Sequence, residues 1–121
     1  MRFVRRERRR GRVGKGFWLD FPIVVLAISF ALSAHLLEMA IWALLFMVLG
    51  EFPTFGLAYY HSAVNYTTLG YGPADVAMSP AWSLLGPLEA AVGMLMFGVS
   101  TAMIFAVIQR MLETRYVDLR S

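Results

Sequence analysis

The residues with the clearest chemical potential are Thr68-Leu69-Gly70-Tyr71-Gly72, in which two glycines alternate with larger side chains. A cation gives up its hydration water only where a ring of oxygens replaces it, and main-chain carbonyls bind weakly enough to release the ion again. Glycine adopts positive φ without penalty, so alternate glycines allow successive carbonyls to point to one side. Thr68 would add a hydroxyl oxygen at the inner end. The segment therefore has the composition of a site for a dehydrated cation.

Two long apolar stretches flank this segment, at Phe21–Gly50 and at about 84–109. About 20 residues of helix cross the hydrocarbon core of a bilayer, so both stretches are long enough to span it. Between them, Thr54–Tyr66 predicts a helix of ~12 residues, which is too short to span. Irregular backbone at membrane depth persists only when it is buried in protein or lines water. We therefore expect an all-α membrane protein with two transmembrane helices and a re-entrant loop that carries the short helix.

Composition and charge support a membrane protein. Of the 121 residues, 59% are hydrophobic and 16% charged, against about 45–50% and 25% in soluble domains. Met1–Lys15 carries eight basic residues, whereas Gly16–Gln109 carries none and five acids. This distribution excludes a cytosolic enzyme, and the absence of cysteine excludes thiol chemistry. By the positive-inside rule, both termini are cytoplasmic in a multi-pass protein of the cell membrane.

A secretory signal peptide is the competing interpretation of the basic start and the apolar core Ile23–Phe30. Small residues near Ala34 would then serve for cleavage. The apolar stretch continues well past that point, which a signal peptide does not require.

The segment Thr68–Gly72 resembles the T-V/I/L-G-Y-G signature of potassium-channel selectivity filters. The order of elements is similar to that of the two-transmembrane bacterial members of the pore-loop ion-channel family. Four stretches carry the resemblance: Ala34–Glu38, Tyr66–Gly72, Leu85–Ala90 and Phe97–Ala102. It implies a pore domain at 17–110, with an outer helix at about 21–50, a pore helix at about 54–66, a filter at 67–72 and an inner helix at about 84–109. A basic cytoplasmic segment, 1–16, would precede this domain, and a short cytoplasmic tail, 111–121, would follow it.

The resemblance implies passive K⁺ conduction through a filter of Thr67, Thr68, Leu69, Gly70, Tyr71 and Gly72. The K⁺ ligands would be the carbonyls of Thr68–Tyr71 and the Thr68 hydroxyl, with no cofactor beyond the K⁺ ions. One filter strand per chain cannot surround an ion, so we expect a homotetrameric potassium-channel pore. Gly93 and Gly98 would form a gating hinge, or allow close packing of helices. Two alternatives stay open: a weakly selective channel for Na⁺ and K⁺, and a non-conducting membrane subunit that assembles with other channel chains.

Two positions depart from the family pattern. Pro73 follows the filter where most members have Asp, and the nearest acid is Asp75. Val64 stands in the pore helix where some members keep a buried Glu. Both carboxylates that brace the filter in relatives are therefore missing.

Intramembrane ionisable residues need a partner or a function. His35 and Glu38 are three residues apart, on one face of the first span. We expect this intramembrane polar pair to be structural, with each residue hydrogen-bonded to the other or to the short helix, and with a proton sensor as the alternative. Glu89 is expected to anchor a helix, and His61 to pack on neighbouring tyrosines or on another subunit.

The basic run at the start of the chain precedes a membrane span and not a soluble domain. We therefore expect it to bind anionic lipid, at about 1 kcal/mol per charge, and to bind no nucleic acid. Its members are Arg5, Arg6, Arg8, Arg9, Arg10 and Arg12.

The replacement of the family's Asp by Pro73 yields the first prediction. Proline offers no side-chain acceptor and no backbone N–H, so the filter should be held less firmly than in relatives. Pro73→Asp should raise the conductance or change the rate of inactivation, measured as currents from reconstituted protein. Currents that match the wild type in rate and amplitude would show that the bracing argument is wrong.

Overall fold

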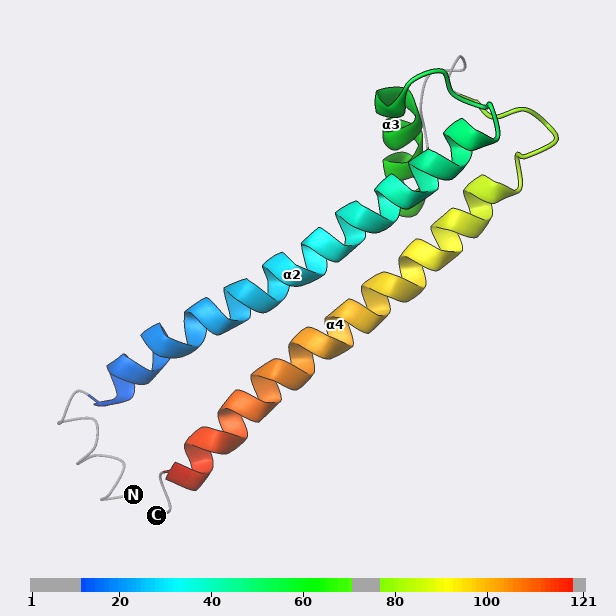
Figure 1. Cartoon of the computed structure of the whole chain (residues 1–121). Helices are drawn as coiled ribbons and strands as arrows, with labels where there is room; N and C mark the ends of the chain where they lie inside the picture. The colour runs from blue at the N-terminus through cyan, green and yellow to red at the C-terminus, as the bar shows by residue number, and fades with distance from the viewer. Residues whose placement is uncertain (1–11, 71–76, 119–121) are drawn as a thin grey trace. The chain divides into compact units, whose positions relative to one another are not determined.

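The computed structural model describes residues 12–70 and 77–118, with side chains at 20–70 and 77–114. Within these ranges the chain forms three helices, α2 (Arg12–Val48), α3 (Phe55–Tyr66) and α4 (Leu85–Asp118). Figure 1 shows the short α3 beside the C-terminal end of α2. The predicted all-helical fold, with two long apolar helices and a short middle one, is confirmed.

The helices α2 and α4 extend beyond the apolar stretches. α2 begins at Arg12 and not at Phe21, and α4 continues to Asp118 and not only to Gln109. The part of α4 beyond Gln109 contains Arg, Met, Leu and Glu, which are good helix formers, so the helix does not end where its apolar stretch ends. Hydropathy marks the part of a helix suited to lipid, whereas hydrogen bonding and capping set where the helix stops.

A glycine turn ends α2. Gly50 has φ +77°, which glycine adopts without steric cost. Its N–H donates to the Met47 carbonyl at 3.0 Å, and the Glu51 N–H donates to the Phe46 carbonyl at 3.0 Å. This pair of bonds is a Schellman motif, which satisfies two carbonyls at the helix end and reverses the chain direction toward α3.

Threonines lie at both ends of α3. The Thr54 hydroxyl accepts from the Leu57 N–H at 3.4 Å, as expected for an N-cap. At the other end, the Thr67 N–H donates to the Ala63 carbonyl at 3.1 Å, and the Thr67 hydroxyl donates to the same oxygen at 2.6 Å. The helix therefore ends where the predicted filter begins.

The chain divides into two compact units, Leu32–Thr101 and Met1–Ala31 with Ala102–Ser121. We call Leu32–Thr101 the central unit; it contains all of α3. A small apolar core joins its helices, composed of Ala43, Phe46, Phe52 and Ala58 with Trp42, Met47, Tyr59, Met78 and Leu85 packed against them. In the other unit, Ala31 is the one buried residue among the described side chains.

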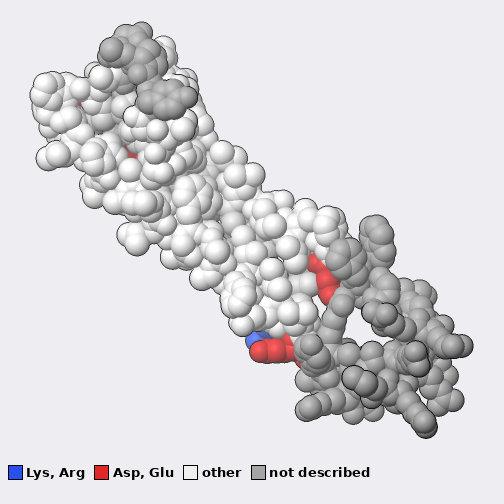
Figure 2. Space-filling view, turned by 180° about the vertical axis from the view of Figure 1, so that it is seen from behind, with Lys and Arg blue, Asp and Glu red and all other residues white. Residues whose placement is uncertain are grey.

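Most apolar side chains of the long helices are exposed. The segments suited to cross a membrane are Asp20–Val48 and Leu85–Thr114, and their most hydrophobic windows are only 17% and 6% buried. Figure 2 shows a face whose described surface carries very little charge. A soluble protein rarely exposes so large an apolar surface, so these helices have the length and the surface of membrane spans.

Close contact between α4 and α3 depends on glycine. A Cβ built on Gly93 would overlap the Tyr66 carbonyl oxygen and lie 3.0 Å from the carbonyl carbon, whereas one on Gly98 would meet nothing within 4 Å. Gly86 similarly faces the Asn65 side chain, because a Cβ built on Gly86 would lie 3.2 Å from Asn65 Nδ2. The packing role considered for Gly93 thus has a structural basis, while the hinge role of Gly93 and Gly98 stays a prediction.

The contrast between the two glycines gives a stability prediction. Gly93→Ala should destabilise the protein by about 1–3 kcal/mol, because α4 must move away from the backbone of α3. Gly98→Ala is the matched control on the same helix and should melt like the wild type. The measurement is thermal unfolding of the purified protein in detergent. Equal melting temperatures for the two variants would contradict the contact.

Candidate functional site

The inner half of the predicted filter folds back onto the end of α3. The Thr68 N–H donates to the Asn65 carbonyl at 2.8 Å, and the Gly70 N–H donates to the Val64 carbonyl at 3.1 Å. Both acceptors belong to the last turn of α3, whose carbonyls have no partner within the helix. The amides at the start of the predicted filter and the carbonyls at the end of the helix therefore satisfy each other's need for a hydrogen-bond partner.

Two residues of this segment have left-handed backbone. Gly70 has φ +71° and Thr68 has φ +60°. Sequence reasoning predicted positive φ at Gly70 but did not predict it at Thr68, because threonine is β-branched and pays roughly 1–2 kcal/mol in this conformation. A Cβ on Gly70 would lie 3.7 Å from the Thr68 carbonyl oxygen, so substitution there meets backbone strain and no clash.

Several predicted positions lie outside the described residues: Tyr71, Gly72, Pro73 and Asp75 near the filter, and Arg5, Arg6, Arg8, Arg9 and Arg10 near the N-terminus. Arg12 is described only as the first residue of α2. The ion-binding and lipid-binding roles of these residues stay predictions.

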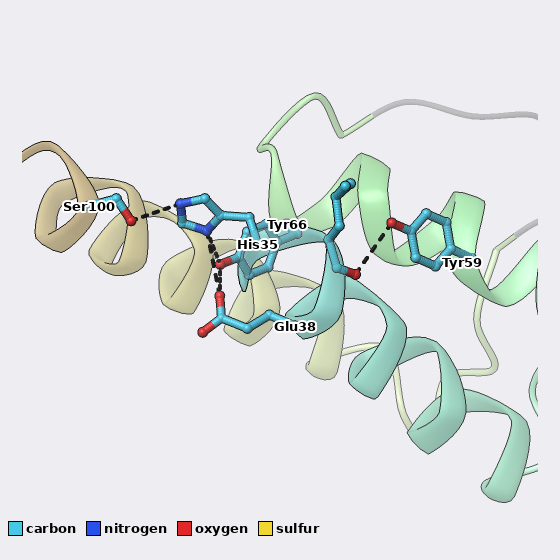
Figure 3. A network of polar contacts seen from close by, with 6 residues as sticks. His35, Glu38, Tyr59, Tyr66 and Ser100 are labelled. Atoms are coloured by element: carbon cyan, nitrogen blue, oxygen red, sulfur yellow. Dashed lines mark hydrogen bonds and ion pairs between the residues drawn. The ribbon is translucent and has the colours of Figure 1, made fainter. Parts of the chain in front are cut away.

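At the C-terminal end of α3, a polar network joins the three helices (Figure 3). His35 Nδ1 lies 2.9 Å from the Tyr66 hydroxyl, and His35 Nε2 lies 2.9 Å from the Ser100 hydroxyl. The Tyr66 hydroxyl donates to Glu38 Oε2. We call these four residues the Tyr66 network; α2 contributes His35 and Glu38, α3 contributes Tyr66 and α4 contributes Ser100.

The number of protons fixes the direction of these hydrogen bonds. Tyr66 has one hydroxyl proton, which goes to Glu38, so His35 Nδ1 must donate its N–H to the phenol oxygen. In a neutral imidazole, Nε2 then accepts from the Ser100 hydroxyl. The polar side-chain atoms of the two buried residues, His35 and Tyr66, thereby all have partners, as buried polar groups require.

The predicted polar pair is therefore joined mainly through a third residue. His35 Nδ1 and Glu38 Oε2 are 3.6 Å apart, which is longer than a hydrogen bond. Sequence reasoning placed the two residues on one face and expected a bond to each other or to the short helix, but it did not identify Tyr66 or Ser100. The sequence did indicate that His35 and Glu38 have partners, because an ionisable side chain within a membrane span needs them.

A second polar junction lies on the same short helix. The Ser62 hydroxyl is 2.9 Å from the Met39 carbonyl of α2 and in hydrogen-bond contact with Glu89 Oε1 of α4. Glu89 has no exposed surface, which agrees with the expected helix anchor. One hydroxyl proton cannot serve both acceptors at once, so the geometry favours a protonated Glu89 that donates to Ser62 while Ser62 donates to Met39.

His61 packs on different aromatic rings from those expected. Its ring lies 5.5 Å from that of Phe46 and 4.7 Å from that of Phe52, and its Nε2 is 2.9 Å from Asn65 Nδ2. The expected partners were tyrosines or another subunit. The Schellman turn at the end of α2 brings Phe52 back over α3, and sequence periodicity could not indicate this contact.

The loop that follows the predicted filter is tied to the end of α2. Glu51 accepts from the Ser79 N–H at 2.7 Å and from the Ser79 hydroxyl at 2.6 Å. These two hydrogen bonds hold the pKa of the Glu51 carboxyl below its ordinary value, and the bond from the Ser79 hydroxyl has the larger effect. The carboxylate at Glu51 thus fixes the start of the segment that leads into α4.

A comparison with protein families identifies one match. A family model described as an ion channel matches residues 23–110, a range that contains all of α3 and the predicted filter and most of both long helices. No curated protein and no solved structure matches the chain.

The junction at Ser62 generates a prediction. Ser62→Ala should destabilise the protein by about 1–3 kcal/mol, because the Met39 carbonyl and Glu89 both lose their buried partner. Glu89→Gln should have little effect, since an amide can donate to Ser62 as a protonated carboxyl does. Both are measured by thermal unfolding in detergent. A loss in Glu89→Gln as large as that in Ser62→Ala would mean that the carboxylate charge is required.

Proposed function

The chain belongs to the ion-channel family whose model matches residues 23–110, and from this we propose that it conducts K⁺ passively across the cell membrane. It is a membrane channel protein and no enzyme. The proposed ligands are the main-chain carbonyls of Thr68, Leu69, Gly70 and Tyr71 and the Thr68 hydroxyl.

The observation that carries this proposal is the backbone of Thr68 and Gly70. Both residues have positive φ, at alternate positions, directly after a short helix. Left-handed backbone at alternate positions allows neighbouring carbonyls to share one side, which an extended strand of L-residues does not. A run of carbonyls on one side is what replaces the water of a cation.

Electrostatics also favour a cation here. The filter follows the C-terminal end of α3, and helix C-termini carry a partial negative charge. The sequence from Gly16 to Gln109 contains no Lys or Arg that would repel a cation. Both features attract positive ions without distinguishing K⁺ from Na⁺.

A complete ring of carbonyls needs four copies of the chain, so the proposed assembly is a homotetramer around a central pore. The exposed apolar surfaces of α2 and α4 would then contact lipid and neighbouring copies. The proposed orientation has both termini in the cytoplasm, because the basic residues cluster there, and the arginine run would bind anionic lipid.

A weakly selective channel for Na⁺ and K⁺ is the second candidate. It is favoured by Pro73 and Val64, which replace the two carboxylates that brace the filter in relatives. Purified wild-type protein in liposomes separates the candidates, because its reversal potential in a K⁺/Na⁺ gradient follows K⁺ for the first and stays near zero for the second.

Gly70→Ala tests the filter assignment. The substitution should abolish K⁺ flux while the tetramer still assembles, because an L-residue resists the positive φ that this position requires. Flux is measured in liposomes and assembly by size in detergent. Gly56→Ala is the control, since Gly56 has ordinary φ and open space around it. If Gly70→Ala kept the K⁺ flux and the selectivity of the wild type, the filter assignment would be overturned.

A further inference from the structure

We propose that Tyr66 is a positioning residue for the filter: its phenol, held by Glu38 and His35, fixes the backbone where α3 passes into Thr67 and Thr68. This inference rests on the proposed function, because it names the side chain that holds the ion-binding segment in register. Tyr66 is not one of the proposed K⁺ ligands, so it would act through the backbone that carries them.

The backbone of Tyr66 is fixed from one side. Tyr66 is the last residue of α3 and has no exposed surface. Its carbonyl group lies directly against Gly93 of α4, where no side chain could fit. The next residue, Thr67, caps the helix, and Thr68 is the first residue after α3 with positive φ.

The side chain of Tyr66 is fixed from the other side. Its hydroxyl donates to Glu38 and is 2.9 Å from His35 Nδ1, so two residues of α2 hold one oxygen. His35 is in turn bonded to Ser100 of α4 at 2.9 Å. The Phe97 ring, 4.6 Å from His35 and 5.6 Å from Tyr66, covers this cluster.

These contacts hold one residue between both long helices. The backbone of Tyr66 is set by α4 and its phenol by α2, so the helix end cannot rotate or shift without breaking one of the two. An ion site of ordered ligands needs its groups held to within about 0.5 Å. The amides of Thr68 and Gly70 donate to the carbonyls of Asn65 and Val64, the two residues directly before Tyr66. A shift at the helix end therefore passes directly into the filter.

Tyr59 offers a matched control. It is also a tyrosine of α3 whose hydroxyl donates to α2, at the Leu36 carbonyl, but this bond is 3.4 Å long and exposed. It lies in the same helix, seven residues before Tyr66 (Figure 3). A general weakening of the α3–α2 contact would affect both tyrosines, whereas a positioning role belongs to Tyr66 alone.

The experiment uses full-length protein reconstituted in liposomes, as wild type, Tyr66→Phe, Tyr59→Phe and Glu38→Leu. The reversal potential in a K⁺/Na⁺ gradient gives the permeability ratio, which does not depend on how many channels fold. Tyr66→Phe and Glu38→Leu should each lower the ratio of K⁺ over Na⁺ roughly fivefold, the size that one lost hydrogen bond corresponds to. Tyr59→Phe should keep the wild-type ratio. A double variant of Tyr66 and Glu38 should be no worse than Tyr66→Phe alone, because Tyr66→Phe already removes the bond to Glu38.

Amide hydrogen exchange of the segment 65–70 provides a readout that is independent of ion selectivity. Tyr66→Phe should accelerate exchange at the Thr68 and Gly70 amides and leave the first turn of α3 unchanged. Unchanged exchange in this segment, or equal effects of Tyr59→Phe and Tyr66→Phe, would overturn the positioning role. A wild type without K⁺ preference would overturn the proposed function instead, and exchange would still decide the role of Tyr66.

Discussion

Backbone that is not helical must find hydrogen-bond partners within the protein when it lies at membrane depth, and the central unit is organised around this requirement. The amides of Thr68 and Gly70 obtain partners from the last carbonyls of α3. A helix end always has such carbonyls to offer. The short helix therefore has two roles for the segment that follows it. It supplies carbonyl acceptors for the amides of that segment, and it is a rigid element held in place by the two long helices.

One face of α3 makes the contacts that hold it. The buried residues of this helix are Ala58, Ser62 and Tyr66, which are four residues apart and therefore lie on one face. Ala58 belongs to the apolar core, Ser62 contacts the acid Glu89 of α4, and Tyr66 contacts the acid Glu38 of α2. Each long helix thus contributes one acid, the buried Glu89 of α4 and the partly buried Glu38 of α2. Each acid contacts a hydroxyl of α3, and the two hydroxyls lie one helical turn apart. An intramembrane acid is costly when alone, so both acids favour the packing in which α3 lies between them.

The parts of this arrangement that follow from local rules were predictable, and those that follow from packing were not. Span length, the short helix and the positive φ of Gly70 depend on hydropathy, length and the absence of a Cβ, all of which are properties of a few adjacent residues. The positive φ of Thr68 has no such signal, because the residue type disfavours it. The bond between Glu38 and Tyr66 joins residues 28 apart in sequence, and periodicity on one helix cannot show which residue of another helix it meets. The need for a partner was readable at His35 and Glu38, but the identity of the partner was not.

The choice of partners for the two acids has an electrostatic consequence. A Lys or Arg is a common partner for an intramembrane acid, yet the sequence from Gly16 to Gln109 contains neither. Glu38 is held instead by the Tyr66 hydroxyl, which donates to it, and Glu89 is held by the Ser62 hydroxyl. Neither hydroxyl carries a positive charge. A basic side chain in either position would place a full positive charge beside the end of α3, where the interior dielectric screens it poorly. Hydroxyl partners hold the same acids and leave the partial negative charge of the helix end available to a cation. The two hydroxyls therefore fix α3 without opposing a cation site at its end.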